Sequence, residues 1–174
     1  LNDDIYVTGN LGDSYLGLKA LSNKVKIRNK DKLFFIDKYY KPNLPLNLTK
    51  YLLKFANSSI DISDGLIDDL TKMINRQSLS FHLFENKIPV SNKLSNLIKK
   101  QRLNKINLIS NGDDYQVLFT ADVNKARIIQ KASKTTGIKI TKIGKIISGK
   151  DRSLICDEKG KQIQAKSKGY IHQF

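Results

Sequence analysis

The sequence contains a single cysteine, Cys156, among its 174 residues. A disulfide within the chain needs two thiols and a cysteine metal cage needs more, so this chain can build neither by itself. We interpret Cys156 as a small, half-buried thiol. The two histidines, His82 and His172, have no partner at the spacing of a metal motif. No spacing of Ser, Cys or His indicates a nucleophile with its base, and no catalytic residue is predicted.

Long hydrophobic runs are also absent. No apolar run approaches the roughly 20 residues needed to cross a bilayer, and the start lacks the basic-then-apolar layout of a signal peptide. These features predict a soluble, cytoplasmic protein. The chain begins at Leu1 rather than at Met, and a strand-like run follows from Ile5, so we expect it to be cut from a longer protein.

Acidic residues are few beside basic ones: 16 Asp and Glu accompany 31 Lys and Arg, which gives a formal net charge of +15. A cluster of such charges would favour binding to nucleic acid, because basic side chains release counterions from polyanions. The lysines are instead scattered from Lys19 to Lys168. The pattern favours a solvated surface, and a basic nucleic-acid-binding module is the alternative.

The pattern of apolar residues predicts helices and strands in an irregular order, which favours one α+β sandwich domain over a doubly wound sheet. Strands are expected at 5–8, 59–63, 79–84, 115–120 and 139–147, and a hairpin at 153–156 and 161–165. Helices are expected at 14–21, 32–40, 48–56, 64–76, 91–101 and 123–136, with one more turn at 105–109. Asp13 and Asp31 are expected to cap the first two helices, and Gly137 to end the last long one.

The segment Asp61-Ile62-Ser63-Asp64-Gly65-Leu66 places three oxygen-bearing side chains where a strand ends and a helix begins. Side chains two apart on a strand point to the same face, so Asp61 and Ser63 can converge with Asp64 on one pocket. A few carboxylates, nucleotide phosphates and waters are the ligands that Mg²⁺ takes in such sites. The segment therefore suits a magnesium ion that accompanies a nucleotide.

A purely structural interpretation of the same segment stays open. Ser63 or Asp64 could cap the helix while Asp61 faces water. Asp68 and Asp69 lie in the first turns of that helix, where negative charge is stabilised by the helix dipole. We interpret these two as structural rather than as metal ligands.

A second polar segment, 110–115, contains the adjacent pair Asp113 and Asp114 before an apolar strand. Neighbouring carboxylates repel each other, so a cation, a donor or water must compensate. The segment is either a surface turn or a site where Asp113 accepts hydrogen bonds from the amine donors of a substrate ring. The glycine turn at 9–13 could cradle a phosphate at a helix start. Because Asp13 adds negative charge there, a structural turn is favoured.

Taken in order, the segments 5–9, 12–14, 61–66, 112–115 and the Lys-Gly-Tyr of 168–170 resemble thiamine-monophosphate kinase, with matching spacing along almost the whole chain. That family belongs to the superfamily of aminoimidazole ribonucleotide synthetase, selenophosphate synthetase and a hydrogenase maturation factor. Its members use ATP and share a two-domain fold. The resemblance implies an ATP- and Mg²⁺-dependent phosphorylation of thiamine monophosphate to thiamine diphosphate, with ATP as co-substrate.

The resemblance further implies that residues 1–174 are the carboxy-terminal domain, a three-layer α/β/α unit of the aminoimidazole ribonucleotide synthetase type that is partly ferredoxin-like. The amino-terminal domain, which in the family supplies most metal-binding aspartates, much of the nucleotide site and the main dimer interface, is absent from the chain. The isolated domain is therefore expected to be inactive, and the full-length protein to be a homodimer.

By position in the family's motifs, Asp61 and Asp64 would bind Mg²⁺ and Ser63 would contact ATP. Asp113 would bind the thiamine moiety, where relatives often carry Glu. Ser167 stands where relatives often have an aromatic side chain that packs on the substrate, which motivates the alternative of another ATP-using member of the superfamily with a different acceptor.

Overall fold

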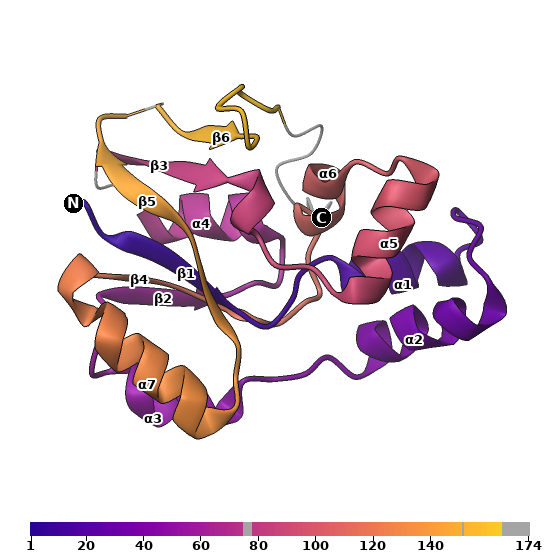
Figure 1. The fold of residues 1–174 in the computed structure, drawn as a ribbon, viewed down its shortest axis with the longest axis horizontal. Coiled ribbons are helices and arrows are strands. Elements are labelled where there is room, and N and C mark those ends of the chain that lie inside the picture. The colour runs from indigo at the N-terminus through magenta and orange to yellow at the C-terminus, as the bar shows by residue number, and fades with distance from the viewer. Residues whose placement is uncertain (75–77, 151, 165–174) are drawn as a thin grey trace, which may run out of the picture.

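The computed structural model of the protein describes residues 1–74, 78–150 and 152–164. At its centre is a six-stranded sheet in the order β2-β4-β1-β5-β3-β6 (Figure 1). The strands are β1 (Asp4–Thr8), β2 (Ser58–Asp61), β3 (Leu79–Phe84), β4 (Val117–Ala121), β5 (Ile140–Ser148) and β6 (Leu154–Cys156). Neighbouring strands are antiparallel except β3 and β6, which pair in parallel.

Helices surround this sheet and also extend beyond one of its ends. They are α1 (Asp13–Leu21), α2 (Asn29–Tyr40), α3 (Thr49–Leu52), α4 (Leu66–Ile74), α5 (Asn92–Gln101), α6 (Lys105–Ile109) and α7 (Ala126–Thr136). Short 3₁₀ turns occur at Leu46–Leu48, Glu85–Lys87 and Val123–Lys125. Within the described ranges, no helix combines the length and the apolar character that a bilayer crossing requires.

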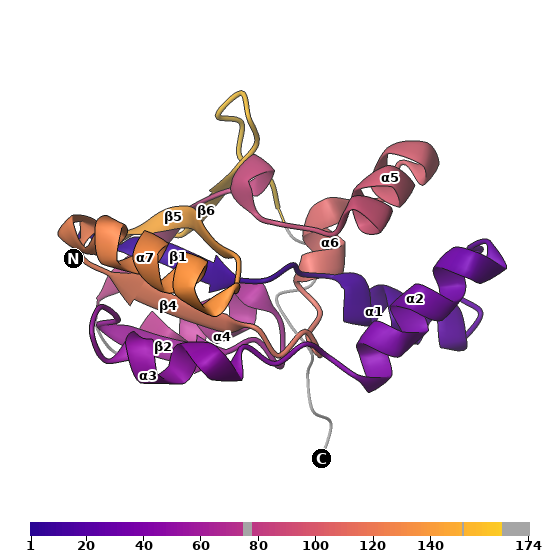
Figure 2. The ribbon, with the colours of Figure 1, turned by 60° about the horizontal axis from the view of Figure 1, so that its bottom comes forward.

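The alternation of side chains along β1 creates two cores, one on each face of the sheet. Ile5 and Val7 point into a core shared with α4, where Leu66 and Leu70 are fully buried. Tyr6 points the other way and stacks on Phe119, with ring centroids 5.2 Å apart, in a core shared with α3 and α7. Figure 2 shows α3 and α7 on the side of the sheet opposite to α4. The α+β, three-layer α/β/α fold class is thereby confirmed.

A third core lies beside the sheet and consists of helices only. Leu16 of α1, Phe35 of α2, and Leu94 of α5 are completely buried there. Gly17 allows α1 and α2 to approach closely, because a Cβ at this position would lie 2.1 Å from the carbonyl oxygen of Phe35. This packed group of helices lies at the end of the sheet where β1 leads into α1 (Figure 1).

Two predicted helix caps are wrong. α1 begins at Asp13 itself after Gly12, which has a left-handed backbone and no side-chain cap. α2 begins at Asn29, two residues before Asp31, so Asp31 lies inside the first turn and pairs instead with Lys93 at 2.9 Å. The helix expected from Ser91 is confirmed, with the Ser91 hydroxyl as its cap accepting from the Leu94 amide, and Gly137 ends α7 as expected with a φ of 70°.

Two predicted elements are shorter than expected. The helix expected at 48–56 is only α3, since the chain turns after Leu52 so that Phe55 can enter the core with Phe119. The second hairpin strand, expected at 161–165, is reduced among its described residues to a single bridge between Cys156 and Gln162. Strand β6 finds its main partner in β3 instead, because Leu83 and Ile155 are both buried there.

Candidate functional site

The two polar segments predicted separately from the sequence lie against each other. Asp61 is the last residue of β2, and the 110–115 segment leads into β4, the strand that pairs with β2. The Asp113 amide donates to the Ser63 carbonyl oxygen at 2.9 Å, and the Tyr115 amide donates to the Ile62 carbonyl oxygen at 2.8 Å. The β2–β4 ladder therefore continues beyond the strands and joins both turns into one site.

Two glycines allow the turns to come this close. A Cβ on Gly112 would lie 1.6 Å from the Ser63 carbonyl oxygen, and a Cβ on Gly65 would lie 2.3 Å from the Ser110 carbonyl oxygen. Gly65 also has a φ of 128°, which residues with a side chain rarely adopt. Each of the two segments thus contains a glycine that lets the backbone of the other segment approach closely.

Asp69 holds the 63–65 turn from inside the protein. Its side chain is buried, and its Oδ2 accepts hydrogen bonds from the amides of Ser63, Asp64 and Gly65 at 3.0 to 3.1 Å. These donors belong to the start of α4, where amides have no partner within the helix. The turn is consequently shaped by a carboxylate four to six residues further along the chain, in agreement with the structural role expected of Asp69.

Lys72 carries the positive charge of the site. Its Nζ forms ion pairs with Asp64, with Asp68 at 2.7 Å and with Asp69 at 3.4 Å. Hydrogen bonds to Asp64 and then to Asp68 raise the pKa of Lys72 above its usual value. One oxygen of each of these three carboxylates lies within 4.8 Å of the others. The ammonium group of Lys72 therefore already places a positive charge among these three carboxylates.

Negative charge from both motifs converges around Tyr115. Partial burial, followed by the charges of Asp113 and Asp61, raises the pKa of the Tyr115 hydroxyl. Burial and then the charge of Asp64 raise the pKa of the Asp113 carboxyl. The structure thus brings Asp61, Asp64 and Asp113 into one electrostatic neighbourhood, which a bound cation would stabilise.

The backbone is strained where the second motif meets the site. Asp113 has a φ of 66° and Tyr115 a φ of 49°, both in the left-handed region that residues with a side chain rarely occupy. Such conformations persist only where surrounding contacts hold them, and they are frequent at ligand sites. Tyr115 is also 40% exposed although it precedes a buried strand.

The donor set suits a hard divalent cation. Asp61 and Asp64 offer carboxylate oxygens and Ser63 a hydroxyl at the rim of the sheet, and Mg²⁺ prefers oxygen ligands of this kind together with phosphates and waters. Lys72 would compete with such an ion for Asp64. Lys72 pairs with Asp64 and Asp68 alike, and Asp69 is engaged by the turn amides. Asp61 and Asp64 therefore stay the predicted ligand pair.

The glycine turn at 9–13 is filled by the protein itself. The Asp114 carboxylate accepts from the Gly12 amide at 2.7 Å and from the Ser14 amide at 3.4 Å. These are the amides that a bound phosphate would use at the start of α1. The structural interpretation of this turn is therefore the better one.

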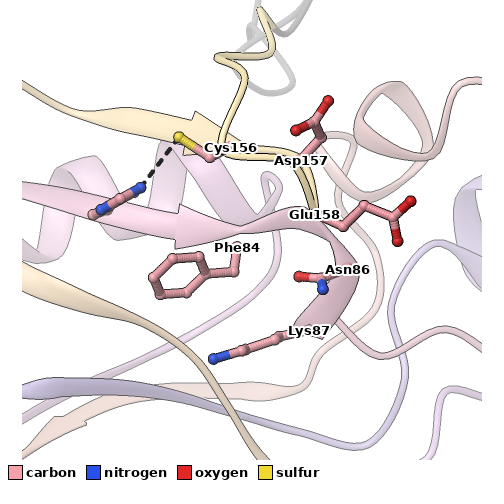
Figure 3. A pocket seen from close by; sticks show the side chains of 8 residues that line it. Phe84, Asn86, Lys87, Cys156, Asp157 and Glu158 are labelled. Carbon is pink, nitrogen blue, oxygen red and sulfur yellow. Dashed lines mark hydrogen bonds between the residues drawn. The ribbon is translucent and has the colours of Figure 1, made fainter.

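A separate pocket lies at the opposite edge of the sheet, where β3 pairs with β6. It has a volume of about 330 Å³ and is lined in part by His82, Phe84, Lys87 and Cys156 (Figure 3). His82 Nε2 lies 3.2 Å from Cys156 Sγ, a contact drawn as a dashed line in Figure 3. This pair could not be predicted from residue spacing, because 74 residues separate its members and β3 and β6 pair in parallel.

Asp61, Ser63, Asp64 and Asp113 are thus brought together, whereas Ser167 and the 168–170 segment lie outside the described residues, as does His172. The ion pairs of Lys72 and the hydrogen bonds of Asp114 were not predicted from the sequence. Asp114, Gln116 and Leu118 are all buried, and this burial at every second position leading into β4 was the available signal.

No family model matches the chain. Among curated proteins, it is 35% identical over 172 residues to the thiamine-monophosphate kinase of Buchnera aphidicola subsp. Schizaphis graminum, an alignment that covers 98% of this chain and 52% of that protein. The thiamine-monophosphate kinase of Escherichia coli K12 is 30% identical over 171 residues, with the same two coverages.

Solved structures give the same picture. The chain matches AaThiL complexed with AMPPCP and TMP with a TM-score of 0.77 and 28% identity, covering 98% of this chain and 52% of that one. E. coli HypE, a hydrogenase maturation protein, matches with a TM-score of 0.70 at 13% identity, which is evidence for the fold alone. The chain spans about half the length of the relatives it matches.

Proposed function

Since the chain belongs to the thiamine-monophosphate kinase family, we propose that its protein transfers the γ-phosphoryl group of ATP to thiamine monophosphate. We further propose that the chain is the carboxy-terminal half of that enzyme, because it aligns over nearly all its length with about half of each relative. The missing half would supply further carboxylates and nucleotide contacts.

The observation that carries this proposal is the convergence of the 61–65 and 110–115 segments. Ser63 and Asp113 are joined by a backbone hydrogen bond of 2.9 Å. In the proposed enzyme Ser63 contacts the nucleotide and Asp113 accepts from an amine donor of the acceptor's ring. A direct hydrogen bond between the two residues holds the nucleotide and the phosphoryl acceptor in fixed relative positions, which phosphoryl transfer requires.

The electrostatic obstacle to this reaction is the approach of two anions. Asp61 and Asp64 would hold Mg²⁺, which neutralises charge on the transferring phosphoryl group. Lys72 pairs with Asp64 and orients its carboxylate before the ion and nucleotide arrive. Asp113 and the exposed Tyr115 form the adjoining part of the site.

The test uses Asp61→Asn and Asp64→Asn in the complete protein. Turnover should fall by roughly 10²-fold or more, the order expected when electrostatic stabilisation of a transition state is removed. The melting temperature should change little, because both side chains are at least partly exposed. Asp68→Asn is the matched control, and it should retain turnover close to wild type.

Wild-type turnover of both variants at saturating Mg²⁺ would remove the metal role. Phosphorylation of a different acceptor by the wild-type protein, with none of thiamine monophosphate, would instead favour another ATP-using member of the superfamily. The chain of residues 1–174 alone should have little or no kinase activity, since half the length of its relatives is missing.

A further inference from the structure

Asp114 is a buried carboxyl group, and among the described residues its side chain forms hydrogen bonds with the start of α1 rather than with the residues assigned to substrate or metal. It is 4% exposed and lies between the 110–115 segment and the start of α1. Its two oxygens accept from the Gly12 and Ser14 amides at 2.7 and 3.4 Å. Burying a carboxyl group costs free energy unless such donors compensate. The burial of Asp114 beside the site therefore needs a structural or functional reason.

The residues on either side of Asp114 are the strained ones. Asp113 and Tyr115 both have positive φ angles, while their amides are tied to the carbonyl oxygens of Ser63 and Ile62. Those two hydrogen bonds hold the segment from the side of β2. Asp114 holds the same segment from the opposite side, through α1.

The start of α1, whose amides donate to Asp114, is itself held by further hydrogen bonds. Ser14 Oγ donates to the carbonyl oxygen of Lys38 in α2 at 3.1 Å, and Asp13 accepts from the hydroxyl of Ser91, the cap of α5, at 2.7 Å. Leu11, next to Gly12, is completely buried. The start of α1 is therefore attached to α2 and α5, and Asp114 links the 110–115 segment to that assembly.

We infer that Asp114 is a positioning residue for acceptor recognition: it fixes the backbone that presents Asp113 and Tyr115 to the acceptor, without contacting the acceptor itself. The inference rests on the proposed function, in which Asp113 binds the acceptor. It assigns to the start of α1 a supporting role in binding the acceptor rather than a phosphate.

The experiment compares Asp114→Asn with wild type in the complete protein. An amide side chain has the same shape but presents an oxygen to only one of the two donors. The KM for thiamine monophosphate should rise about tenfold or more, as expected when a buried amide donor loses its acceptor, while the KM for ATP stays within about twofold. Hydrogen exchange at the Gly12 and Tyr115 amides should accelerate together.

Asp113→Asn and Asp122→Asn are the matched controls. Asp113→Asn should raise the acceptor KM without changing exchange at Gly12, because it removes the contact and leaves the support. Asp122, an exposed cap of the 123–125 turn, follows the end of β4 whereas the 110–115 segment precedes its start, and its substitution should change neither quantity. If Asp114→Asn accelerates exchange at Gly12 but leaves the acceptor KM unchanged, Asp114 is only a structural cap and the inference is wrong.

Two further measurements keep the inference testable. If Asp114→Asn does not fold, wild-type exchange decides: binding of thiamine monophosphate should protect Gly12 together with Tyr115, and protection of Tyr115 alone would overturn the inference. If the wild-type protein phosphorylates no thiamine monophosphate, the proposed function fails, whereas joint acceleration at Gly12 and Tyr115 in Asp114→Asn would still support the mechanical link.

Discussion

The amide of Asp113 donates a 2.9 Å hydrogen bond to the carbonyl oxygen of Ser63, fifty positions earlier in the chain. Neither side chain takes part, so the contact depends on the path of the backbone through the two turns. Any change that separates the two turns should therefore disturb both halves of the site at once.

Gly112→Ala tests this dependence most directly. The added Cβ would fall 1.6 Å from the Ser63 carbonyl oxygen, a clash with backbone that no side-chain motion can relieve. We expect a loss of stability of about 3 kcal/mol or more, in the upper range for single substitutions, together with loss of kinase turnover. Denaturant unfolding and activity assays would measure the two effects.

Gly160→Ala is the matched control. Gly160 has a φ of 79° but nothing within 4 Å of its added Cβ, so the change carries backbone strain without a clash. It should lower the free energy of unfolding by only about 1 to 2 kcal/mol. Equal effects of the two substitutions would mean that the turns can separate without penalty.

Asp69→Ala should destabilise the protein much more than Asp68→Ala. Removing the Asp69 carboxylate leaves three amides of the 63–65 turn without their acceptor, one of them buried and two partly buried, and an unpaired buried donor costs about 1 to 3 kcal/mol. Asp68 pairs only with the half-exposed Lys72 among the contacts seen for it, and such pairs contribute about 0 to 1 kcal/mol. Chemical denaturation of both variants is the measurement, and equal losses would contradict the role given to Asp69.

The buried pair Asp13 and Asp114 should make stability fall as pH rises. Burial raises the pKa of Asp114 to about 8 and that of Asp13 to about 6, and in the first case the charge of Asp13 adds to the effect. The folded protein thus holds protons that the unfolded chain releases near pH 4. Their contribution is complete below that pH and is lost as pH rises through 6 and then 8, by at most about 1.4 kcal/mol per pH unit for each retained proton.

Unfolding measured between pH 5 and 8 for wild type and Asp114→Asn would isolate this contribution. The variant has no titrating group at position 114, so its free energy of unfolding should decline less steeply over that range. Parallel pH dependences would show that Asp114 is ionised in the folded protein.

Lys72→Met should strengthen the apparent binding of Mg²⁺ to the complete protein. The Lys72 ammonium pairs with Asp64, one of the two proposed ligands, and competes with a divalent ion for the same oxygens. Without it, half-saturation by Mg²⁺ should require several-fold less metal, measured by turnover against metal concentration. A higher requirement would mean that Lys72 contacts the nucleotide instead of competing with the ion.

The elements that the sequence predicted well are those with local causes. The strand at 79–84 depends on the alternation of its residues. The helix that begins after Ser91 and the helix that ends at Gly137 depend on caps within a few residues. The helix expected at 48–56 was too long, because its apolar residues are used by a turn that brings Phe55 to Phe119. Such a contact between segments 64 residues apart leaves no periodic signal.

The site was predictable in its residue types but not in its construction. Asp61, Asp64 and Asp113 could be selected because carboxylates in turns next to strands can converge on one pocket. The three amides gathered by Asp69 could have been foreseen in part, since Asp69 lies on the same helix face as Leu66, Leu70 and Met73 and had to be buried. The hydrogen bond from the Gly12 amide to Asp114 joins residues 102 positions apart, so it could be seen only in the structure.

The pairing of β2 with β4 has a kinetic consequence. The two strands that carry the site are joined only after the chain has closed a loop of more than fifty residues, from Asp61 to Val117. Contacts this distant form late, because the entropy of closing the loop is lost before any of them stabilises the protein. During refolding, secondary structure should therefore recover before nucleotide binding, and partly folded chains should hold intact helices with no usable site.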